Sequence, residues 1–314
     1  MSEPAGGRLV SRLGDAGLGA GTLAGEIEDW LRAYDYRVET EGRAARLLLP
    51  GRPPLPWHTR LSRRRLRPVS DAYEPVATAL FDFLADRIGP TLFLDLGAAE
   101  GYFSALAASY PGAEIRTLGI DMRPDHVAAF RARAEAIGAA GRMEAMLAGL
   151  SDEARGERPV WYSVTKMFER PPPASAYRDP PWIRLKFRLL GRPGRDRLRE
   201  IRLPIHTVDS LVAERGRAPG ILKIDVDGAE GKVLSGARET LVRARPAVML
   251  ELHKAKFLAP HGIARADVPA PLFEAGYRAF LFDRPDDLAR CRAIPLGAED
   301  PAWRRTRTDL LLFV

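Results

Sequence analysis

Short apolar runs of strand length alternate with segments of helical periodicity along most of the chain. The strand-length runs lie at 91–96, 114–120, 142–148, 220–226, 246–252, 277–282 and 308–314. Apolar residues at helical spacing mark 73–88, 102–109, 124–137, 207–215, 229–243 and 267–275. Strands that alternate with helices form sheets covered on both faces, so we predict an α/β fold. The expected architecture is a Rossmann-like, doubly wound sheet of seven strands, mostly parallel, with an antiparallel last strand.

Two regions depart from this alternation. Residues 1–72 predict a helix over 24–34 with Thr22 as its N-cap, then a small hairpin of 37–39 and 45–49, and we interpret them as an N-terminal extension that caps the substrate. Residues 154–205 are proline-dense and basic, with scattered aromatic residues. A long aperiodic segment inside a compact domain is typical of a functional lid, so we interpret it as a lid-like insertion in a domain of residues 73–314. A decoration of the fold or an oligomer contact is the alternative for the insertion.

The run at 91–96 carries Asp95 and leads into a turn of small residues, Gly97 to Gly101. Glycine lets the backbone bend sharply there and lets a ligand approach without a Cβ in the way. Ala99 and Tyr102 break the G-x-G-x-x-G pattern of dinucleotide sites, and the G-K-[ST] of a phosphate loop is absent. An acid near a strand end followed by G-x-x-x-G favours an S-adenosylmethionine (SAM) loop, in which Asp95 orients the loop or the cofactor's ammonium group. An ordinary tight turn is the alternative.

A second acid strengthens this interpretation. Asp121 ends the second strand of the series, about 20 positions after Gly101, where nucleotide-binding sheets place the residue that accepts hydrogen bonds from ribose hydroxyls. Ser151 and Asp152 follow the third strand, where an adenine edge would lie, although Ser-Asp also simply makes turns.

Composition and charge limit the remaining possibilities. The chain has 314 residues, is 46% hydrophobic, and has a single cysteine, which excludes an internal disulfide framework and a cysteine-rich zinc site. No apolar run is long enough to span a membrane, and no signal peptide is evident, so we expect a soluble, cytoplasmic protein. The net charge of +7 comes mostly from arginine scattered along the chain, and we expect no nucleic-acid partner.

Two segments, 94–108 and 206–253, together resemble the FkbM family of SAM-dependent methyltransferases. The motifs read Asp95-x-Gly97-Ala98-Ala99-x-Gly101, Thr207-x-Asp209-x-Leu211, Lys223-x-Asp225-Val226-Asp227-Gly228-Ala229-Glu230 and Glu251-x-His253. The resemblance covers roughly residues 74–283 and implies the class I methyltransferase version of the fold, with SAM as cofactor. The sequence departs from the family at Ala99, where asparagine is usual, at Asp121, where Glu-Pro is common, and at Asp227, where glutamate is usual.

The predicted catalytic residues lie at the carboxyl ends of two neighbouring strands. In sheets of this family Asp225 ends the strand nearest the transferable methyl group, and it could orient the acceptor, act as a base or bind a metal. His253 is the candidate general base because the ordinary pKa of histidine is near neutral. Glu251 could orient His253 or face the helix layer. A divalent cation held by Asp225, Asp227, Glu230 and His253 is conceivable, but no metal is predicted, since Asp227 and Glu230 also suit the turn and the helix N-terminus.

The sequence therefore predicts a SAM-dependent O-methyltransferase. The resemblance implies a hydroxyl on a sugar, polysaccharide unit or natural product as the acceptor, so the expected partner is a small molecule or glycan. The alternatives are an RNA or protein methyltransferase and a non-catalytic binding module with the same fold. The predicted catalytic residues are His253, Asp225 and Glu251. The residues predicted to bind the cofactor are Asp95, Gly97, Ala98, Ala99, Gly101, Tyr102, Phe103, Asp121, Met122, Ser151, Asp152 and Asp225.

Overall fold

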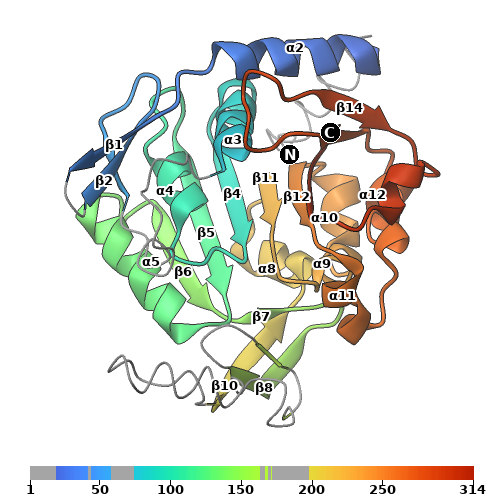
Figure 1. Cartoon of the computed structure of the whole chain (residues 1–314). Coiled ribbons are helices and arrows are strands. Elements are labelled where there is room, and N and C mark those ends of the chain that lie inside the picture. The colour runs from blue at the N-terminus through green and yellow to red at the C-terminus, as the bar shows by residue number, and fades with distance from the viewer. Residues whose placement is uncertain (1–18, 42–43, 58–73, 163–166, 169–170, 172–197) are drawn as a thin grey trace, which may run out of the picture.

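A mixed, mostly parallel sheet forms the centre of the computed structural model, which describes residues 19–41, 44–57, 74–162, 167–168, 171 and 198–314 (Figure 1). Its strands are β4 (Thr91–Leu96), β5 (Ile115–Asp121), β6 (Met143–Leu147), β11 (Pro219–Ile224), β12 (Ala247–Leu252), β13 (Ala279–Phe282), β14 (Ala293–Leu296) and β15 (Asp309–Phe313). They lie in the order β14-β13-β15-β12-β11-β4-β5-β6. β6, β5, β4, β11 and β12 are parallel, and β15 is antiparallel to β12. The predicted fold class is confirmed.

The sheet has one strand more than the seven predicted from the sequence. β14 pairs with β13 at the edge of the sheet and contains Pro295. Proline weakens the case for a strand in sequence reasoning, but an edge strand tolerates it because one side of its backbone needs no partner.

Helices follow the strands along the chain. They are α3 (Pro75–Ile88), α4 (Tyr102–Ala108), α5 (Pro124–Ala136), α8 (Val208–Arg215), α9 (Glu230–Ser235), α10 (Arg238–Arg243), α11 (Ala255–Leu258) and α12 (Ala270–Glu274), with 3-10 turns η1 (Ala259–His261), η2 (Arg265–Asp267) and η3 (Pro301–Arg304). The core lies on both faces of the sheet, because alternate residues of each strand point to opposite sides. In β4, for example, Phe93 belongs to one apolar cluster, and Leu92 and Leu94 belong to the other.

The single helix predicted over 229–243 is wrong. The structure has two short helices there, α9 and α10, separated by Gly236 and Ala237. A Cβ on Gly236 would overlap the carbonyl oxygen of Ser151, so the chain is pressed against its neighbour at the break. Asp209 then receives the backbone N–H groups of Glu239 and Thr240 at 3.0 and 2.8 Å, which satisfies the first turn of α10.

The N-terminal region contributes a helix and a small sheet. These elements are α2 (Ala20–Ala33), β1 (Arg37–Glu41), β2 (Ala44–Leu48) and β3 (Leu55–Trp57), and the antiparallel strands lie in the order β1-β2-β3. Thr22 is not the N-cap: the cap position is Gly19, and Thr22 lies within the helix. Ile27 and Leu31 of α2 share an apolar cluster with Phe81 and Phe83 of α3, so the described part of the extension packs on the α/β domain.

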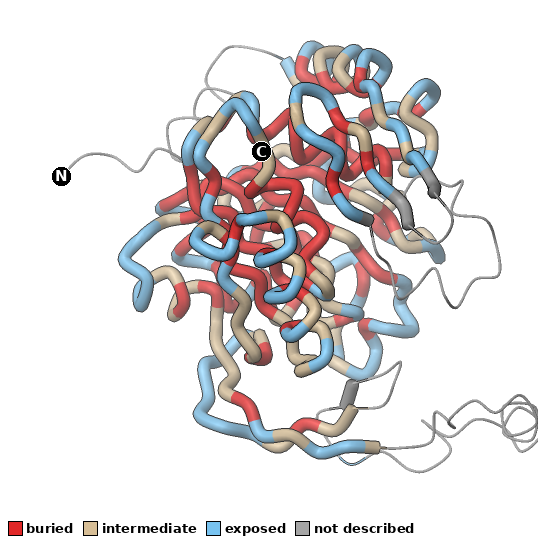
Figure 2. Tube along the Cα trace, turned by 90° about the vertical axis from the view of Figure 1, so that its left-hand side faces the viewer, coloured by how far each residue is buried: buried red, intermediate tan, exposed pale blue. Residues whose placement is uncertain are grey.

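A second small sheet interrupts the main series after β6. It contains β7 (Gly149–Leu150), β8 (Arg155–Tyr162), β9 (Met167–Phe168) and β10 (Arg199–His206) in the order β7-β10-β8-β9. Figure 1 shows β8 and β10 projecting from the body of the molecule, and Figure 2 shows that much of this ribbon is exposed. The strands were not predicted, because exposure along β8 removes the alternation that identifies a strand. Most of the predicted insertion, including 172–197, lies outside the described residues.

Candidate active site

The turn after β4 is held against the two neighbouring strands. Gly97, Ala99 and Gly101 have φ values of +82°, +46° and +77°. The N–H groups of Gly97 and Ala98 donate to the carbonyl of Ile120 at 2.9 and 3.0 Å, at the end of β5. A Cβ on Gly97 would overlap the carbonyl oxygen of Asp225. The side of Gly97 that lacks a Cβ therefore faces the chain that leaves β11, and not an incoming ligand as the sequence suggested.

Asp121 lies beside this turn, as predicted. Its Oδ2 accepts the backbone N–H of Ala99 at 3.0 Å and lies 3.1 Å from Nδ1 of His126, and its Oδ1 accepts the N–H of Arg123 at 2.8 Å. A carboxylate can accept about four hydrogen bonds, so one acceptor position of Oδ1 remains among these contacts. The pairing of loop and acid inferred from the sequence thus exists in the fold.

Three of the predicted cofactor residues are enclosed in the core. Asp95 is buried, and its Oδ2 accepts the hydroxyl hydrogen of Ser104 at 2.8 Å, which ties β4 to α4. Burial raises the pKa of Asp95. Tyr102 is buried with its hydroxyl 2.6 Å from Thr78 Oγ1, and the Phe103 ring packs inside the same apolar cluster. These contacts favour the loop-orienting role for Asp95, one of the two roles considered from the sequence.

Met122, Ser151 and Asp152 lie at the start of the second sheet. Met122 Cε approaches Gly149 of β7, and the N–H of Ser151 donates to the carbonyl of His206 at 3.0 Å. The Ser151 hydroxyl donates to Asp152 at 2.8 Å. These contacts belong to a turn, which was the alternative reading of Ser151 and Asp152.

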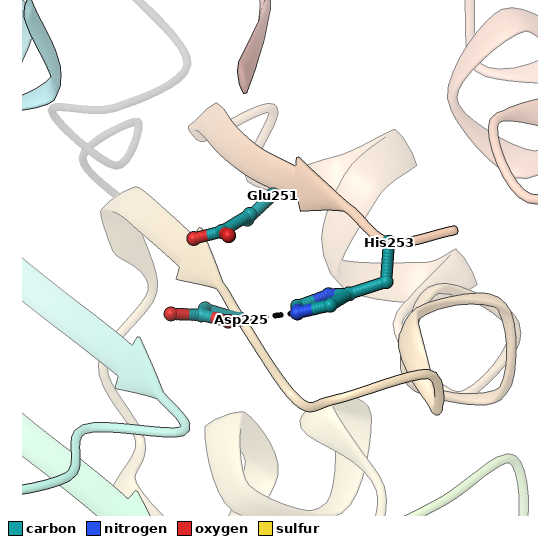
Figure 3. Close-up of side chains that lie close together, drawn as sticks. All are labelled: Asp225, Glu251 and His253. Carbon is teal, nitrogen blue, oxygen red and sulfur yellow. Dashed lines mark ion pairs between the residues drawn. The ribbon is translucent and has the colours of Figure 1, made fainter. Parts of the chain in front are cut away.

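Asp225, Glu251 and His253 converge where β11 and β12 end (Figure 3). One donor atom from each lies within 4.8 Å of the others. The N–H of Asp225 donates to the carbonyl of Leu96 at 2.9 Å, which places this cluster directly beside the turn after β4. The three residues predicted to be catalytic are therefore neighbours in the fold.

Two charged residues around the cluster, Lys223 and Glu230, are not among the site residues predicted from the sequence. Lys223 Nζ lies 3.1 Å from Asp225 Oδ2 and 4.9 Å from the Phe103 ring centre. Lys223 and Asp225 are two positions apart in an extended chain and so point to the same side, which is the signal that would have revealed the pair. Glu230 is fully buried, and its Oε1 accepts the N–H of Gly228 at 3.0 Å and lies 2.7 Å from His253 Nδ1. Glu230, rather than Glu251, therefore orients the imidazole ring.

The carboxylates shift the pKa values of the cluster. Burial raises the pKa of Glu251 to about 8, and the charges of Asp225 and Glu74 act in the same direction. Burial alone would lower the pKa of His253, but the hydrogen bond to Glu230 and its charge, with those of Asp225 and Glu251, outweigh this and raise the pKa to about 9. His253 thus does not have the near-neutral pKa that the sequence argument for a general base assumed.

A buried arginine fixes the chain at the end of β12. Arg265 is 5% exposed, and its Nε donates to the carbonyl of His253 at 3.1 Å. Its Nη1 donates to the carbonyl of Trp303 at 2.8 Å, and its Nη2 donates to Asp309 Oδ2 at 2.7 Å. Sequence reasoning did not identify Arg265, because nothing local distinguishes it from the many other arginines of the chain.

Three left-handed residues other than glycine, Glu74, Ala99 and Asp227, are connected with this part of the sheet. Among the described residues other than glycine, φ is positive at Glu74, Ala99, Asp227 and Arg245. Ala99 lies in the turn, Asp227 Oδ1 lies 3.4 Å from His253 Nε2, and the charge of Glu74 acts on both Lys223 and Glu251. Such conformations cost of order 1–3 kcal/mol each and cluster at functional sites, which supports this edge of the sheet as the active site.

Comparison with known proteins connects this site to one family. The family model described as the methyltransferase FkbM domain matches residues 157–279, a range that begins after the Gly97 turn and includes Asp225, Glu251 and His253. No curated protein matches the chain.

Solved structures of methyltransferases also match the chain, at low sequence identity. The FkbM methyltransferase of Methylobacillus flagellatus KT is 14% identical at a TM-score of 0.40, over 72% of this chain and 44% of that one. A SAM-dependent methyltransferase of Agrobacterium tumefaciens is 12% identical at a TM-score of 0.41, over 88% and 71%. An O-methyltransferase of Bacillus cereus in complex with SAH is 11% identical at 0.38, over 78% and 82%. The chain thus spans less than half the length of the first of these proteins.

The domain match and the strand order are independent observations. The match comes from the sequence of the second half of the chain, whereas the strand order also includes β4, β5 and β6, which precede the match. No helix within the described ranges is long and apolar enough to cross a membrane. Residues 157–279 therefore match the methyltransferase FkbM domain, the model of a family whose methyl donor is S-adenosylmethionine.

Proposed function

We propose that this protein transfers a methyl group from SAM to a hydroxyl group of a sugar, polysaccharide unit or natural product. The observation that carries the proposal is that the turn after β4 and the cluster of Asp225, Glu251 and His253 lie side by side at one edge of the sheet. The turn after β4 contacts both Asp121 and the backbone of Asp225, and Asp225 in turn belongs to the cluster with Glu251 and His253. A cofactor on the turn would thus lie beside a polar cluster suited to an acceptor hydroxyl.

The residues at this edge of the sheet fit the cofactor. In α/β sheets of this kind ligands bind outside the carboxyl ends of the strands, where the strand order reverses. β4 is such a point, since β5 and β11 lie on its two sides. The remaining acceptor position of Asp121 Oδ1 suits a ribose hydroxyl, and Gly97 to Gly101 leave a turn with almost no side chains beside it. Asp95 serves in this proposal by fixing α4 rather than by touching SAM.

The cofactor supplies an electrophilic methyl group on a sulfonium. Transfer would break the C–S bond with its electron pair left on sulfur, join the methyl carbon to the acceptor oxygen and release the hydroxyl proton to solvent. The protein contributes alignment and a place for the acceptor. Asp225, Glu251 and His253 are the residues that we assign to the acceptor side, because they adjoin the turn without being part of it.

The acceptor is selected, in this proposal, by the N-terminal extension and the insertion at 154–205. Tyr36, which follows α2, interacts with Tyr102 at the start of α4, so the extension reaches the helix that follows the turn. The β8 and β10 ribbon projects from the body after β7, which pairs with β10 beside Ser151. The extension thus contacts Tyr102 and the insertion begins beside Ser151, and both of these residues were predicted to bind the cofactor.

Replacing Asp121 with alanine is expected to weaken SAM binding about 10- to 100-fold, since a hydrogen bond to a charged group contributes about 1.5–3 kcal/mol. Isothermal titration calorimetry with SAM measures this directly. Asp125→Ala is the matched control, because Asp125 is an acid of the same stretch whose ion-pair partner is Arg123, and it should bind SAM like the wild type. Absence of binding heat with folded wild-type protein would reject the proposed function.

A further inference from the structure

We propose that Asp225, Glu251 and His253 form a binding site for a divalent cation, which holds the acceptor hydroxyl for methyl transfer. The role in transfer rests on the proposed function, whereas the binding of the cation can be measured without it. No metal was predicted from the sequence. The four cation ligands considered there included Asp227 and Glu230 and did not include Glu251.

The three side chains offer donor atoms from two adjacent strand ends. Asp225 follows β11, and Glu251 and His253 lie at the end of β12. Two carboxylate oxygens and one imidazole nitrogen lie within 4.8 Å of one another, as Figure 3 shows for the side chains. Small side-chain rotations bring such atoms to metal–ligand distances of about 2.0–2.2 Å. Three protein ligands leave further coordination positions open, which is the arrangement of catalytic rather than structural metal sites.

The imidazole of His253 is oriented as a metal ligand would be. The residue is 7% exposed, and its Nδ1 contacts the fully buried carboxylate of Glu230 at 2.7 Å. Within the described part of the chain Nε2 has no hydrogen bond, and its nearest charged atoms are Asp227 Oδ1 at 3.4 Å and Asp225 Oδ1 at 3.9 Å. Histidine ligands of metals characteristically bind a carboxylate through the other ring nitrogen, which fixes the tautomer and the ring plane. A buried nitrogen that is held in place and left without a hydrogen bond is the second observation for a cation here.

The net negative charge of the cluster also favours binding of a divalent cation. Four carboxylates lie around His253, those of Asp225, Asp227, Glu230 and Glu251, while Lys223 supplies one ammonium group. Lys223 contacts Oδ2 of Asp225, which leaves Oδ1, 3.9 Å from His253 Nε2, as the oxygen that would bind a metal. When the carboxylates are ionised and the imidazole is neutral, as metal binding requires, the cluster has an excess of negative charge that a divalent cation would compensate. Groups of mixed oxygen and imidazole donors suit Mn²⁺ or Zn²⁺ better than Ca²⁺.

A cation at this point would assist the removal of the proton from the acceptor hydroxyl. Binding to a cation lowers the pKa of a coordinated hydroxyl, so that its proton can pass to solvent before the methyl group moves to the oxygen. Two open positions on the cation would accept two oxygens of the acceptor. The inference therefore narrows the acceptor to a hydroxyl with an oxygen on the adjacent carbon, as in the vicinal diol of a sugar.

The test is a titration with Mn²⁺ followed by electron paramagnetic resonance, in which the signal of free hexaaqua Mn²⁺ falls as the ion binds. The wild type should bind one Mn²⁺ per chain, with and without S-adenosylhomocysteine. Asp225→Asn and Glu251→Gln should bind at least tenfold more weakly, and Glu230→Gln about 10- to 100-fold more weakly through loss of His253 orientation. Glu144→Gln is the matched control, because this half-exposed carboxylate pairs with Arg215 and does not belong to the cluster, so the variant should bind Mn²⁺ like the wild type.

Circular dichroism spectra and SAM titrations on the same samples separate the possible failures. Wild-type protein that does not take up Mn²⁺, or folded Asp225→Asn and Glu251→Gln proteins that take it up as the wild type does, would overturn the cation site. If these proteins still bind SAM, the proposed function survives that outcome. If the protein takes up Mn²⁺ specifically but does not bind SAM, the result would support the cation site and reject the proposed function.

Discussion

Gly97→Ala is expected to destabilise the protein by about 3–5 kcal/mol and to abolish measurable SAM binding. The alanine would adopt a left-handed conformation that costs about 1–2 kcal/mol. Its Cβ would also overlap the carbonyl oxygen of Asp225, and backbone atoms cannot move aside as a flexible side chain can. Relief of this overlap requires the turn to separate from the chain after β11, which would part the cofactor side of the site from the acceptor side.

Gly138→Ala is the matched control for this substitution. Gly138 has a φ of +67°, but no heavy atom lies within 4 Å of where its Cβ would be. Gly138→Ala should therefore lose only about 1–2 kcal/mol and keep its affinity for SAM. Urea denaturation and calorimetry on both variants measure the difference. Equal stability of the two variants would show that the contact between Gly97 and Asp225 does not hold the turn in place.

Arg265→Ala is the second substitution with a large expected effect, a loss of about 3–5 kcal/mol of unfolding free energy. The arginine joins the carbonyl of His253 to that of Trp303 and to the carboxylate of Asp309, all of them buried or nearly so. Removing the guanidinium leaves these acceptors without their partner and frees the backbone that carries His253. Mn²⁺ uptake should fall with stability, because one of the three proposed ligands loses its support.

Urea denaturation of Arg265→Ala should be compared with that of Arg243→Ala. The Arg243 side chain is 79% exposed and pairs with Glu239 one helical turn away, so its removal should cost less than about 0.5 kcal/mol. Arg265→Lys should lie between the two, since lysine keeps the charge but cannot reach all of the carbonyl groups. A loss below 1 kcal/mol in Arg265→Ala would contradict the role given to this residue.

The sequence was most informative where local chemistry determines structure. The apolar runs of β4, β11 and β12 fix buried strands, and Thr207 is a residue type favoured at helix N-caps: its Oγ1 accepts the N–H of Ser210 at 2.9 Å. The neighbourhood of the Gly97 turn and Asp121 followed from the rule that carboxyl ends of parallel strands meet at one edge. These inferences needed no knowledge of which side chains touch.

Tertiary contacts account for what the sequence did not disclose. Asp95 resembles a ligand-binding acid in the sequence, but it is buried and accepts a hydrogen bond from Ser104 of α4. Glu230 could not be recognised as the partner of His253, because 23 positions separate them and only the close approach of α9 to the end of β12 brings them together. Ser151 lies against Gly236 at the end of α9, where a Cβ would not fit. Each of these depends on packing between distant segments, which periodicity does not encode.

Amide hydrogen exchange with and without SAM is the most direct measurement of whether the cofactor lies on the turn between β4 and α4. Protection is expected at 97–103 and 121–123, where the turn and Asp121 would contact the cofactor. The amides of β13 and β14, at the far edge of the sheet, should exchange at unchanged rates. Binding of SAM that leaves 97–103 and 121–123 unprotected, or that protects only another part of the chain, would contradict the account.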